Sequence, residues 1–292
     1  MADTQITQDM INLYDEYTHL TLDRRRFMES LAKLAGSSAA AAVIAPMLGA
    51  SAAQASIIEE NDPRVRGGEV PWPGASGEMK GYLAIPADAK GKLGAVIVIH
   101  ENRGLNEHTK DIARRMALEG FVALAVDFLS PKGGTPADEE LARKLIGELD
   151  GAMTTADAVA TVAFLKAHEA VNGKVGAMGF CWGGGLVNSL AVSAPDLNGG
   201  VAYYGRQAEA VDVAKIMSPL MLHYGGLDER INAGIPAFEA ALKENNKQYQ
   251  IFIYDGVNHA FNNDTSEARY DKAAADLAWS RTVEFFKKNL AV

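Results

Sequence analysis

The stretch VGAMGFCWGGG, from Val175 to Gly185, decides the fold of this 292-residue chain and contains its only cysteine. Its first half is apolar and typical of a strand, and a helical pattern begins at Trp182. Residues 179–183 read Gly-x-Cys-x-Gly, the pattern of a nucleophile elbow with cysteine in place of serine. Glycines leave room for the strained backbone of such a turn, and the helix that follows points its positive end at the sulfur. We therefore expect Cys181 to be a nucleophile rather than an inert buried thiol.

On both sides of this stretch, strand and helix patterns alternate. The apolar, β-branched run at 93–100 predicts a central strand that is covered on both faces. The runs at 69–73 and 78–86, joined by turn residues, predict an antiparallel pair. Further strand patterns lie at 121–128, 174–180, 199–205, 219–225 and 249–255, and helical patterns at 107–120, 136–149, 153–169, 232–245 and 267–288. This alternation predicts an α/β domain with a mostly parallel central sheet of about eight strands and helices on both faces.

Composition excludes several classes of protein. The chain has 37 acidic and 28 basic residues and a net charge of −9, which argues against a cationic surface for nucleic acid. A single cysteine excludes a disulfide within the chain. The sequence has no group of His, Cys, Asp or Glu with ligand spacing, so we expect neither a metal nor a cofactor.

The N-terminus has the features of an export signal. The segment DRRRFM at 23–28 resembles a twin-arginine motif, and an Ala-rich apolar stretch follows it. Ala53-Gln54-Ala55 fits the A-x-A pattern of a cleavage site. We therefore expect residues 1–55 to be a signal peptide that binds the twin-arginine export machinery. The enzyme would then be periplasmic, with no stable membrane association after cleavage.

After this signal we expect a linker at 56–68 and the enzyme domain at 69–292. The alternative is a cytoplasmic protein in which an amphipathic helix begins after Asp23. The long polar stretch before the arginines is unusual for a signal peptide.

A thiol nucleophile needs a base, and the base needs an acid to orient it. Where such an elbow occurs, the chain order is nucleophile, acid, histidine. Only His223 and His259 follow Cys181. His223 lies inside an apolar strand pattern, so we expect it in the core. His259 follows the last strand, at the edge of the sheet where functional groups gather, and we expect it to be the base.

The acid is expected in the loop after the preceding strand, where Asp228 follows two glycines. Asp255 and Asp264 are the competing candidates, but Asp255 lies too close to the base along the chain. We expect the oxyanion to be held by the backbone N–H groups of Trp182, the residue after the nucleophile, and of Asn102, which follows the central strand.

Six motifs resemble the dienelactone hydrolase family, whose members have the α/β-hydrolase fold. They are VIVIHENRGLNEH, DFLSPKGG, GKVGAMGFCWGGG, AYYG, HYGGLDE and YDGVNHAF. The resemblance covers about residues 68–290. It implies a Cys-His-Asp triad of Cys181, His259 and Asp228 that cleaves a small ester or lactone through an acyl-enzyme, as a carboxymethylenebutenolidase does.

The resemblance also implies that Glu101 interacts with the resting thiol and moves when substrate binds; otherwise Glu101 is a solvated loop residue. Family members that bind dienelactone hold its carboxylate with arginines, one of them shortly after the catalytic histidine. Residues 259–263 read HAFNN here and contain no arginine. We expect Arg206, Phe128 and Tyr204 to contact the substrate instead.

Two other functions remain open from the sequence. The chain could be a broader carboxylesterase or thioesterase. It could also be a degenerate hydrolase that serves as a binding or scaffold protein.

Overall fold

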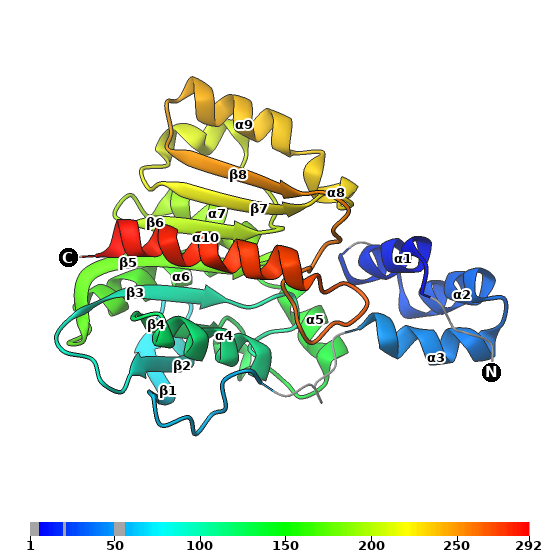
Figure 1. Ribbon diagram of the computed structural model, residues 1–292, viewed down its shortest axis with the longest axis horizontal. Helices are drawn as coiled ribbons and strands as arrows, with labels where there is room; N and C mark the ends of the chain where they lie inside the picture. The colour runs from blue at the N-terminus through cyan, green and yellow to red at the C-terminus, as the bar shows by residue number, and fades with distance from the viewer. Residues whose placement is uncertain (1–5, 20–21, 50–55, 292) are drawn as a thin grey trace.

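The computed structural model describes residues 6–19, 22–49 and 56–291 of the chain. Its centre is an eight-stranded, mostly parallel sheet with the strand order β1-β2-β4-β3-β5-β6-β7-β8 (Figure 1), which confirms the predicted fold class. The strands are β1 (Val65–Pro73), β2 (Glu78–Pro86), β3 (Leu93–Ile99), β4 (Val122–Asp127), β5 (Val171–Phe180), β6 (Gly199–Tyr203), β7 (Leu220–Gly225) and β8 (Tyr249–Tyr254).

The helices follow the predicted alternation with the strands. They are α1 (Gln8–His19), α2 (Arg24–Ala35), α3 (Ser38–Leu48), α4 (Glu107–Leu118), α5 (Glu139–Gly147), α6 (Gly151–Ala167), α7 (Trp182–Ser193), α8 (Glu229–Asn232), α9 (Ile235–Glu244) and α10 (Lys272–Leu290). Two 3₁₀ turns, η1 (Ser130–Lys132) and η2 (Ala210–Lys215), lie in the loops.

Helices cover both faces of the sheet. Along β3, Ala95 and Ile97 belong to the apolar cluster that contains residues of α6, α7 and α9. Val96 and Val98 belong to the cluster on the opposite face, with residues of α4 and α10. Since successive side chains of a strand point to opposite faces, a strand between two helical layers has to be apolar throughout.

The edge of the sheet differs from the prediction in one respect. β1 pairs antiparallel with β2, as expected, but it begins at Val65, inside the segment expected to be a linker. The charged residues of this segment had made it look like a loop. In the strand, a Cβ on Gly67 would overlap the hydroxyl group of Tyr82, so the glycine leaves room for a neighbouring side chain.

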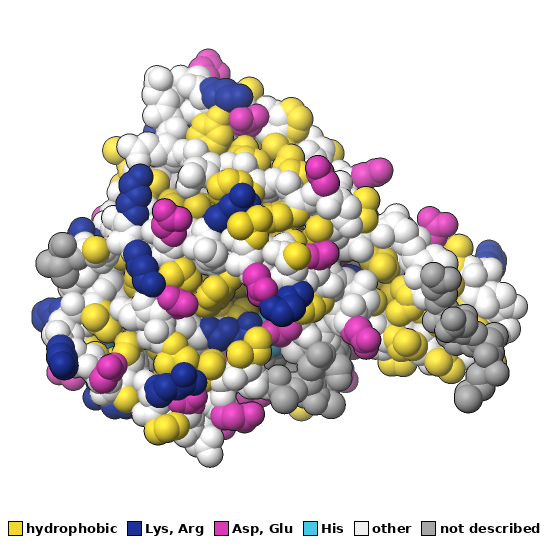
Figure 2. Space-filling model, in the orientation of Figure 1, with side chains coloured by type: hydrophobic (Ala, Val, Ile, Leu, Met, Phe, Trp, Pro, Cys, Tyr) yellow, Lys and Arg dark blue, Asp and Glu magenta, His cyan; other side chains and the backbone are white. Residues whose placement is uncertain are grey.

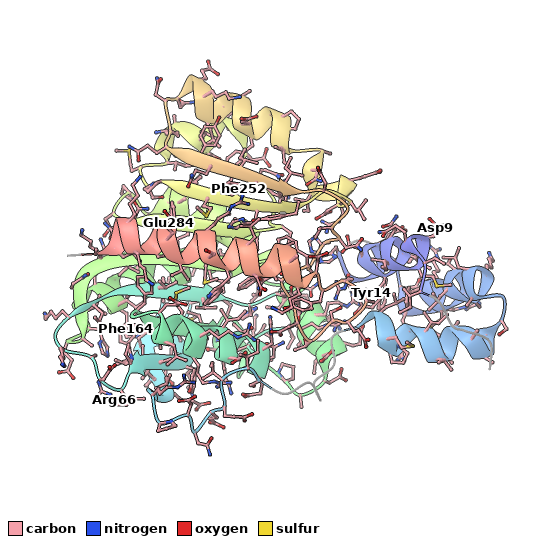
Figure 3. The ribbon with its side chains drawn as sticks, in the orientation of Figure 1. Asp9, Tyr14, Arg66, Phe164, Phe252 and Glu284 are labelled. Atoms are coloured by element: carbon pink, nitrogen blue, oxygen red, sulfur yellow. The ribbon has the colours of Figure 1, made fainter. Side chains whose placement is uncertain are left out.

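The first three helices form a unit beside the sheet with an apolar core of its own (Figure 1). Its buried members include Tyr14, Tyr17, Phe27, Leu31 and Ile44. Tyr14 lies on the side of α1 toward the sheet domain, whereas Asp9 points away from it (Figure 3). Leu34, Val43 and Met47 of this unit stay exposed on α2 and α3, and Figure 2 shows hydrophobic side chains on the surface of the unit.

The arginine-bearing segment forms α2. Asp23 caps this helix by accepting a hydrogen bond from the N–H of Arg26. A helix that begins after Asp23 is also what the alternative to an export signal predicted. No single described helix is long and apolar enough to cross a membrane; α2 and α3 meet that test only as a pair bent by 111°. The expected cleavage site, Ala53-Gln54-Ala55, lies outside the described residues.

The approach of α7 to β3 generates the first prediction. A Cβ on Gly183 would lie 2.5 Å from the carbonyl oxygen of His100 and 2.6 Å from that of Ile99. We expect Gly183→Ala to lower the free energy of unfolding by about 3 kcal/mol, because two backbones would have to separate. Urea unfolding followed by circular dichroism measures this.

Gly151→Ala is the matched control, since nothing lies within 4 Å of its added methyl group. At the start of α6 it should leave stability unchanged or raise it by up to about 1 kcal/mol. Equal effects of the two substitutions would contradict the close packing of α7.

Candidate active site

Cys181 lies at the tip of a strained turn between β5 and α7. Its backbone has φ 54° and ψ −113°, a conformation that residues other than glycine rarely adopt. The Cys181 N–H donates to the carbonyl oxygen of Tyr203 at 3.0 Å, which ties the turn to β6. A Cβ on Gly179 would overlap the carbonyl of Gly183. The turn therefore has the geometry that the Gly-x-Cys-x-Gly pattern predicts.

The predicted acid and base are in contact. Asp228 follows β7 and caps α8, where its Oδ1 accepts from the N–H of Ile231 at 3.2 Å. Its Oδ2 lies 2.5 Å from His259 Nδ1. Burial opposes protonation of His259, but the carboxylates of Asp15 and Asp228 outweigh it and raise the pKa of the imidazole. His259 Nε2 is buried and has no hydrogen-bond partner among the described residues.

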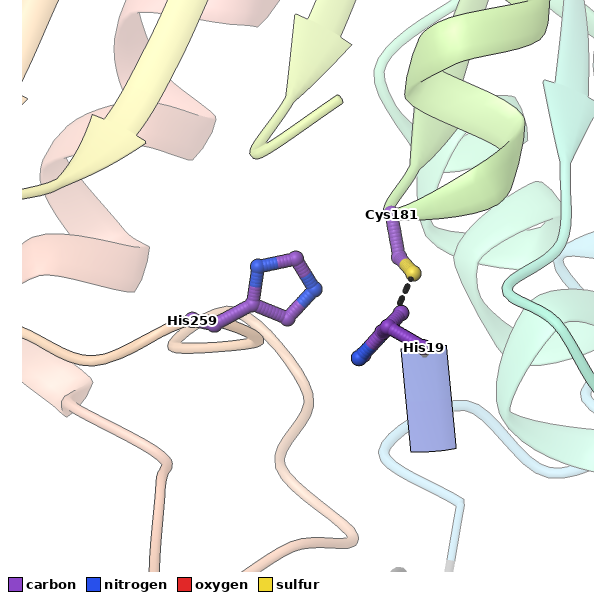
Figure 4. A group of neighbouring side chains, drawn as sticks. All are labelled: His19, Cys181 and His259. Carbon is purple, nitrogen blue, oxygen red and sulfur yellow. Dashed lines mark hydrogen bonds between the residues drawn. The ribbon is translucent and has the colours of Figure 1, made fainter. Parts of the chain in front are cut away.

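A second histidine occupies the place beside the thiol. His19, the last residue of α1, has its Nε2 2.8 Å from Cys181 Sγ (Figure 4). Its ring centroid lies 4.7 Å from that of His259. One turn earlier on α1, Asp15 Oδ1 lies 3.0 Å from His19 Nδ1. The thiol is therefore near two imidazoles: the Asp228 carboxylate orients His259, while His19 Nδ1 lies 2.9 Å from the backbone carbonyl oxygen of Asp15.

The opposite charges of His19 and Asp15 stabilise each other. Burial opposes protonation of His19, but the Cys181 thiolate and the Asp15 carboxylate outweigh it and raise the pKa of His19 to about 9. Burial raises the pKa of the Asp15 carboxyl. The nearby His259, His19 and Arg230 outweigh this effect and bring the pKa well below its usual range.

Polar contacts hold α1 against the sheet domain along its length. They are Gln8 Nε2 to Asn258 Oδ1 (2.5 Å), Arg230 to Asp15 (3.1 Å), Arg103 to the Tyr14 hydroxyl (2.7 Å), the Tyr17 hydroxyl to Glu140 (2.7 Å) and Asn102 Nδ2 to the carbonyl of Thr18 (2.8 Å). The partners lie in the loops that follow β3, β7 and β8 and at the start of α5. Because these loops surround the elbow, α1 lies across the functional edge of the sheet.

Glu101 lines the same small cavity as His19, Cys181 and His259. Its carboxylate accepts hydrogen bonds from Asn263 Nδ2 at 2.9 Å and from the Tyr204 hydroxyl at 3.3 Å. It is therefore a bound residue of the site, not a freely solvated one.

The residues expected to contact substrate lie in different places. Arg206 lines a cavity of about 550 Å³ that reaches Cys181 and Trp182. The Tyr204 ring lies 4.9 Å from that of His259. Phe128 is buried behind Trp182, with ring centroids 5.7 Å apart, and does not line that cavity. A second cavity, of about 650 Å³, lies between β8 and α10 and contains none of the candidate catalytic residues.

The histidine and the two carboxylates that were not assigned to the triad lie in other surroundings. His223 is fully buried between the Tyr254 hydroxyl (2.9 Å) and Thr282 (3.2 Å), and burial lowers its pKa to about 3. Asp264 pairs with His108 and Arg115, and Asp255 is exposed. The apolar strand pattern around His223 had predicted its place in the core.

His19, Cys181 and His259 offer three ligand atoms within 4.8 Å of one another, as do Asp15, Asp228 and His259. Ligand spacing in the sequence misses these groups because their members are far apart in the chain. Thiolate and imidazole suit a soft divalent ion such as zinc. However, two ligands of a tetrahedral zinc lie about 3.5 Å apart. The 2.8 Å between His19 Nε2 and Cys181 Sγ is a hydrogen bond.

Sequence reasoning missed Asp15 and His19 because they precede the arginines of the expected signal. The available signal was the polar stretch NLYDEYTH at residues 12–19. It places Asp15 and His19 four residues apart, on one face of a helix.

The raised pKa of His19 predicts how stability changes with pH. The folded value, about 9, exceeds the ordinary value of 6.5, so this group stabilises the fold fully below about pH 6.5 and loses the effect as the pH rises through 9. The gap in melting temperature between the native chain and His19→Gln should therefore shrink from pH 6 to pH 10. Differential scanning calorimetry measures it, and a constant gap would contradict the ionic contact.

Comparison with known proteins places this site in a family. Residues 79–290 match the model of the "Dienelactone hydrolase family". A protein of Escherichia coli O157:H7 named "Putative carboxymethylenebutenolidase" is 31% identical over 254 residues, and the match covers 82% of this chain and 93% of that one. A Bradyrhizobium protein named "Probable 2-oxo-3-(5-oxofuran-2-ylidene)propanoate lactonase" is 32% identical over 232 residues, and the match covers 74% of this chain and 92% of that one.

Solved structures agree. The crystal structure titled "Putative Dienelactone Hydrolase from Klebsiella pneumoniae" has a TM-score of 0.70 and 28% identity, and the match covers 77% of this chain and 99% of that one. Asp15 and His19 precede the residues that the family model matches. The chain therefore belongs to the dienelactone hydrolase family and has its α/β-hydrolase fold.

Proposed function

We propose that this hydrolase cleaves a small ester or lactone, with Cys181 as the nucleophile and the Asp228–His259 pair as its proton carrier. The observation that carries the proposal is the strained turn that presents Cys181 at the start of α7, close to a buried imidazole bound to a carboxylate. Strain at such a turn is typical of functional residues. The lactone-cleaving activities in the names of the relatives support the same reaction class.

The reaction follows from these groups. The Cys181 sulfur, freed of its proton by an imidazole, attacks the carbonyl carbon, and the C=O electron pair moves to oxygen. N–H groups of Trp182 and Asn102 hold this oxyanion. When the carbonyl reforms, the C–O bond breaks and the leaving oxygen takes a proton from an imidazolium. Water, deprotonated by His259, then attacks the thioester and releases the acid and Cys181.

The 550 Å³ cavity beside Cys181 has a volume in the range of sites that bind small molecules, which supports a small substrate. Arg206 is the basic residue of that cavity, although it pairs with Glu209 at 2.9 Å. We propose that a substrate carboxylate displaces Glu209 from Arg206. Glu101 lines the same cavity as Cys181, and we propose that its carboxylate, without a hydrogen bond to the sulfur, opposes ionisation of the resting thiol by its charge.

The triad is tested by hydrolysis of p-nitrophenyl acetate. Cys181→Ala should abolish turnover and Cys181→Ser should keep a small remnant, because the turn and the oxyanion donors remain. His259→Gln should lower kcat by about a hundredfold or more. His223→Ala is the control, and it should mainly lower the melting temperature through lost core contacts.

Turnover that survives in Cys181→Ala would refute the thiol mechanism. No turnover of any ester, lactone or thioester by the native chain would point to a binding protein instead. A preference for thioesters or simple esters over lactones would identify the broader esterase.

We also propose that the twin-arginine machinery exports the protein to the periplasm. The arginines at 24–26, exposed at the start of α2, support this proposal. Fractionation of cells followed by N-terminal sequencing tests it: a periplasmic protein that begins near Ser56 is the expected result. A full-length chain found only in the cytoplasm would refute export.

A further inference from the structure

The sulfur of Cys181 is bonded to a residue outside the proposed triad. His19 Nε2 lies 2.8 Å from Sγ, and Figure 4 shows this hydrogen bond with the His259 ring to one side. The His19 ring makes an edge-on contact with that of His259, with 4.7 Å between the centroids. His259 Nε2 is buried and has no hydrogen-bond partner among the described residues. In the full chain, α1 thus holds the thiol, and the proposed base is not bonded to it.

We propose that α1 is an inhibitory cover, which occupies the place where a substrate would meet Cys181 and His259 and which is lost when residues 1–55 are cleaved off. The inference rests on the proposed thiol hydrolase and on the cleavage near Ser56 proposed above. All of α1, at 8–19, lies in the segment that this cleavage removes. His19 has no part in the chemistry; it holds the sulfur until the helix is gone.

The space beside the sulfur is too small for a substrate while α1 is docked. The cavity between Cys181 and His259 has a volume of about 30 Å³, and α1 forms part of its wall through Thr18 and His19. Such a volume has room for about one water molecule. The carbonyl group of a substrate has to lie here, because the expected oxyanion donor Asn102 lines the same cavity. The helix therefore fills the place of the reacting group.

The larger cavity beside Cys181 does not replace this space. It has a volume of about 550 Å³ and reaches Cys181 and Trp182, but neither Asn102 nor His259 lines it. A molecule bound there contacts the turn without meeting the proposed base. α1 can therefore stop the reaction without filling the larger cavity, because it covers the side of the sulfur on which the base lies.

α1 is attached in a way that allows it to leave. The two apolar clusters that pack the sheet contain no residue before Val65, whereas the unit of α1, α2 and α3 has an apolar cluster of its own. Hydrogen bonds from Gln8, Asp15 and Tyr17 join α1 to the sheet domain. Permanent interfaces are more hydrophobic than such a contact. The sheet domain therefore keeps its core when residues 1–55 are removed.

The covered chain still presents its arginines. The side chains of Arg25 and Arg26, at the start of α2, are 87% and 73% exposed. Because α1 and α2 belong to one unit, the folded precursor presents these arginines while its thiol is covered. Cleavage after export would then remove the signal and the cover in one step.

Cleavage of the folded chain tests the cover. A specific protease site inserted after Ala55 allows the full chain to be cut without refolding, and gel filtration then removes residues 1–55. We expect kcat/KM for p-nitrophenyl acetate to rise about tenfold or more, which corresponds to a docking free energy of about 1.4 kcal/mol. The uncut chain keeps a lower, basal turnover, since a small fraction of its molecules has α1 undocked. The triad tests above measure that basal turnover.

Two full-chain variants form a matched pair on α1. His19→Ala removes the side chain that holds the sulfur and should raise kcat/KM several-fold. Asp9→Ala changes an exposed residue that points away from the sheet domain (Figure 3) and should leave kcat/KM unchanged. Circular dichroism shows whether both variants and the separated domain keep the native fold.

The outcomes separate the cover from the proposed function. Equal turnover before and after removal of residues 1–55, lost in Cys181→Ala, would refute the cover alone. A loss of turnover in a folded His19→Ala chain would also refute it, because His19 would then take part in the reaction. No turnover of any ester, lactone or thioester by the separated, folded domain would refute the proposed function. If the domain unfolds on separation, the full-chain variants decide: native turnover in His19→Ala refutes the cover, and raised turnover supports it.

Discussion

The arrangement of the whole site depends on how closely two backbones approach at the turn around Cys181. Gly179 and Gly183 leave no side chain between the end of β5 and the first turn of α7, and Gly183 meets the end of β3 directly. This contact forces Cys181 to a positive φ and lifts its sulfur above the edge of the sheet. The cost of the strained residue is offset by the strands and helices packed on both sides of it.

Loops at that edge converge on the sulfur from separate strands. The loop after β3 supplies Asn102 and Glu101, and the loops after β7 and β8 supply Asp228 and His259. Parallel strands place all these loops at one edge, which is why open α/β sheets bind ligands there. α1 adds to this edge from outside the sheet, so residues that precede the part matched by the family model can reach the same thiol.

The sequence was sufficient for features that rest on local pattern. The apolar run of β3 predicted a doubly covered strand, and the apolar neighbours of His223 predicted its place in the core. It also predicted the Asp228–His259 contact, since the fold restricts where these roles can fall. The charged, loop-like segment before Glu69 misled the prediction of β1, because Gly67 leaves room there for Tyr82, a contact that no local pattern reveals.

His19 could not be predicted for a different reason. Its contact with Cys181 joins residues 162 positions apart, and neither helical spacing nor a family motif encodes such a pairing. The surrounding composition, with arginines followed by an Ala-rich run, resembles an export signal, so nothing in the sequence placed the helix before it beside the thiol. The burial of Asp15 and His19 is visible only in the folded chain.

The contacts of α1 also impose an order on assembly. A ribosome makes this segment well before its partners Arg230 and Asn258, which lie 215 residues after Asp15 and 250 residues after Gln8. Until the strands β7 and β8 are in place, α1 has nothing to dock against, and closing so long a loop is entropically unfavourable. The earliest part of the active site to be synthesised is thus the last to be positioned, and a nascent chain carries an elbow thiol that lacks both of its imidazoles.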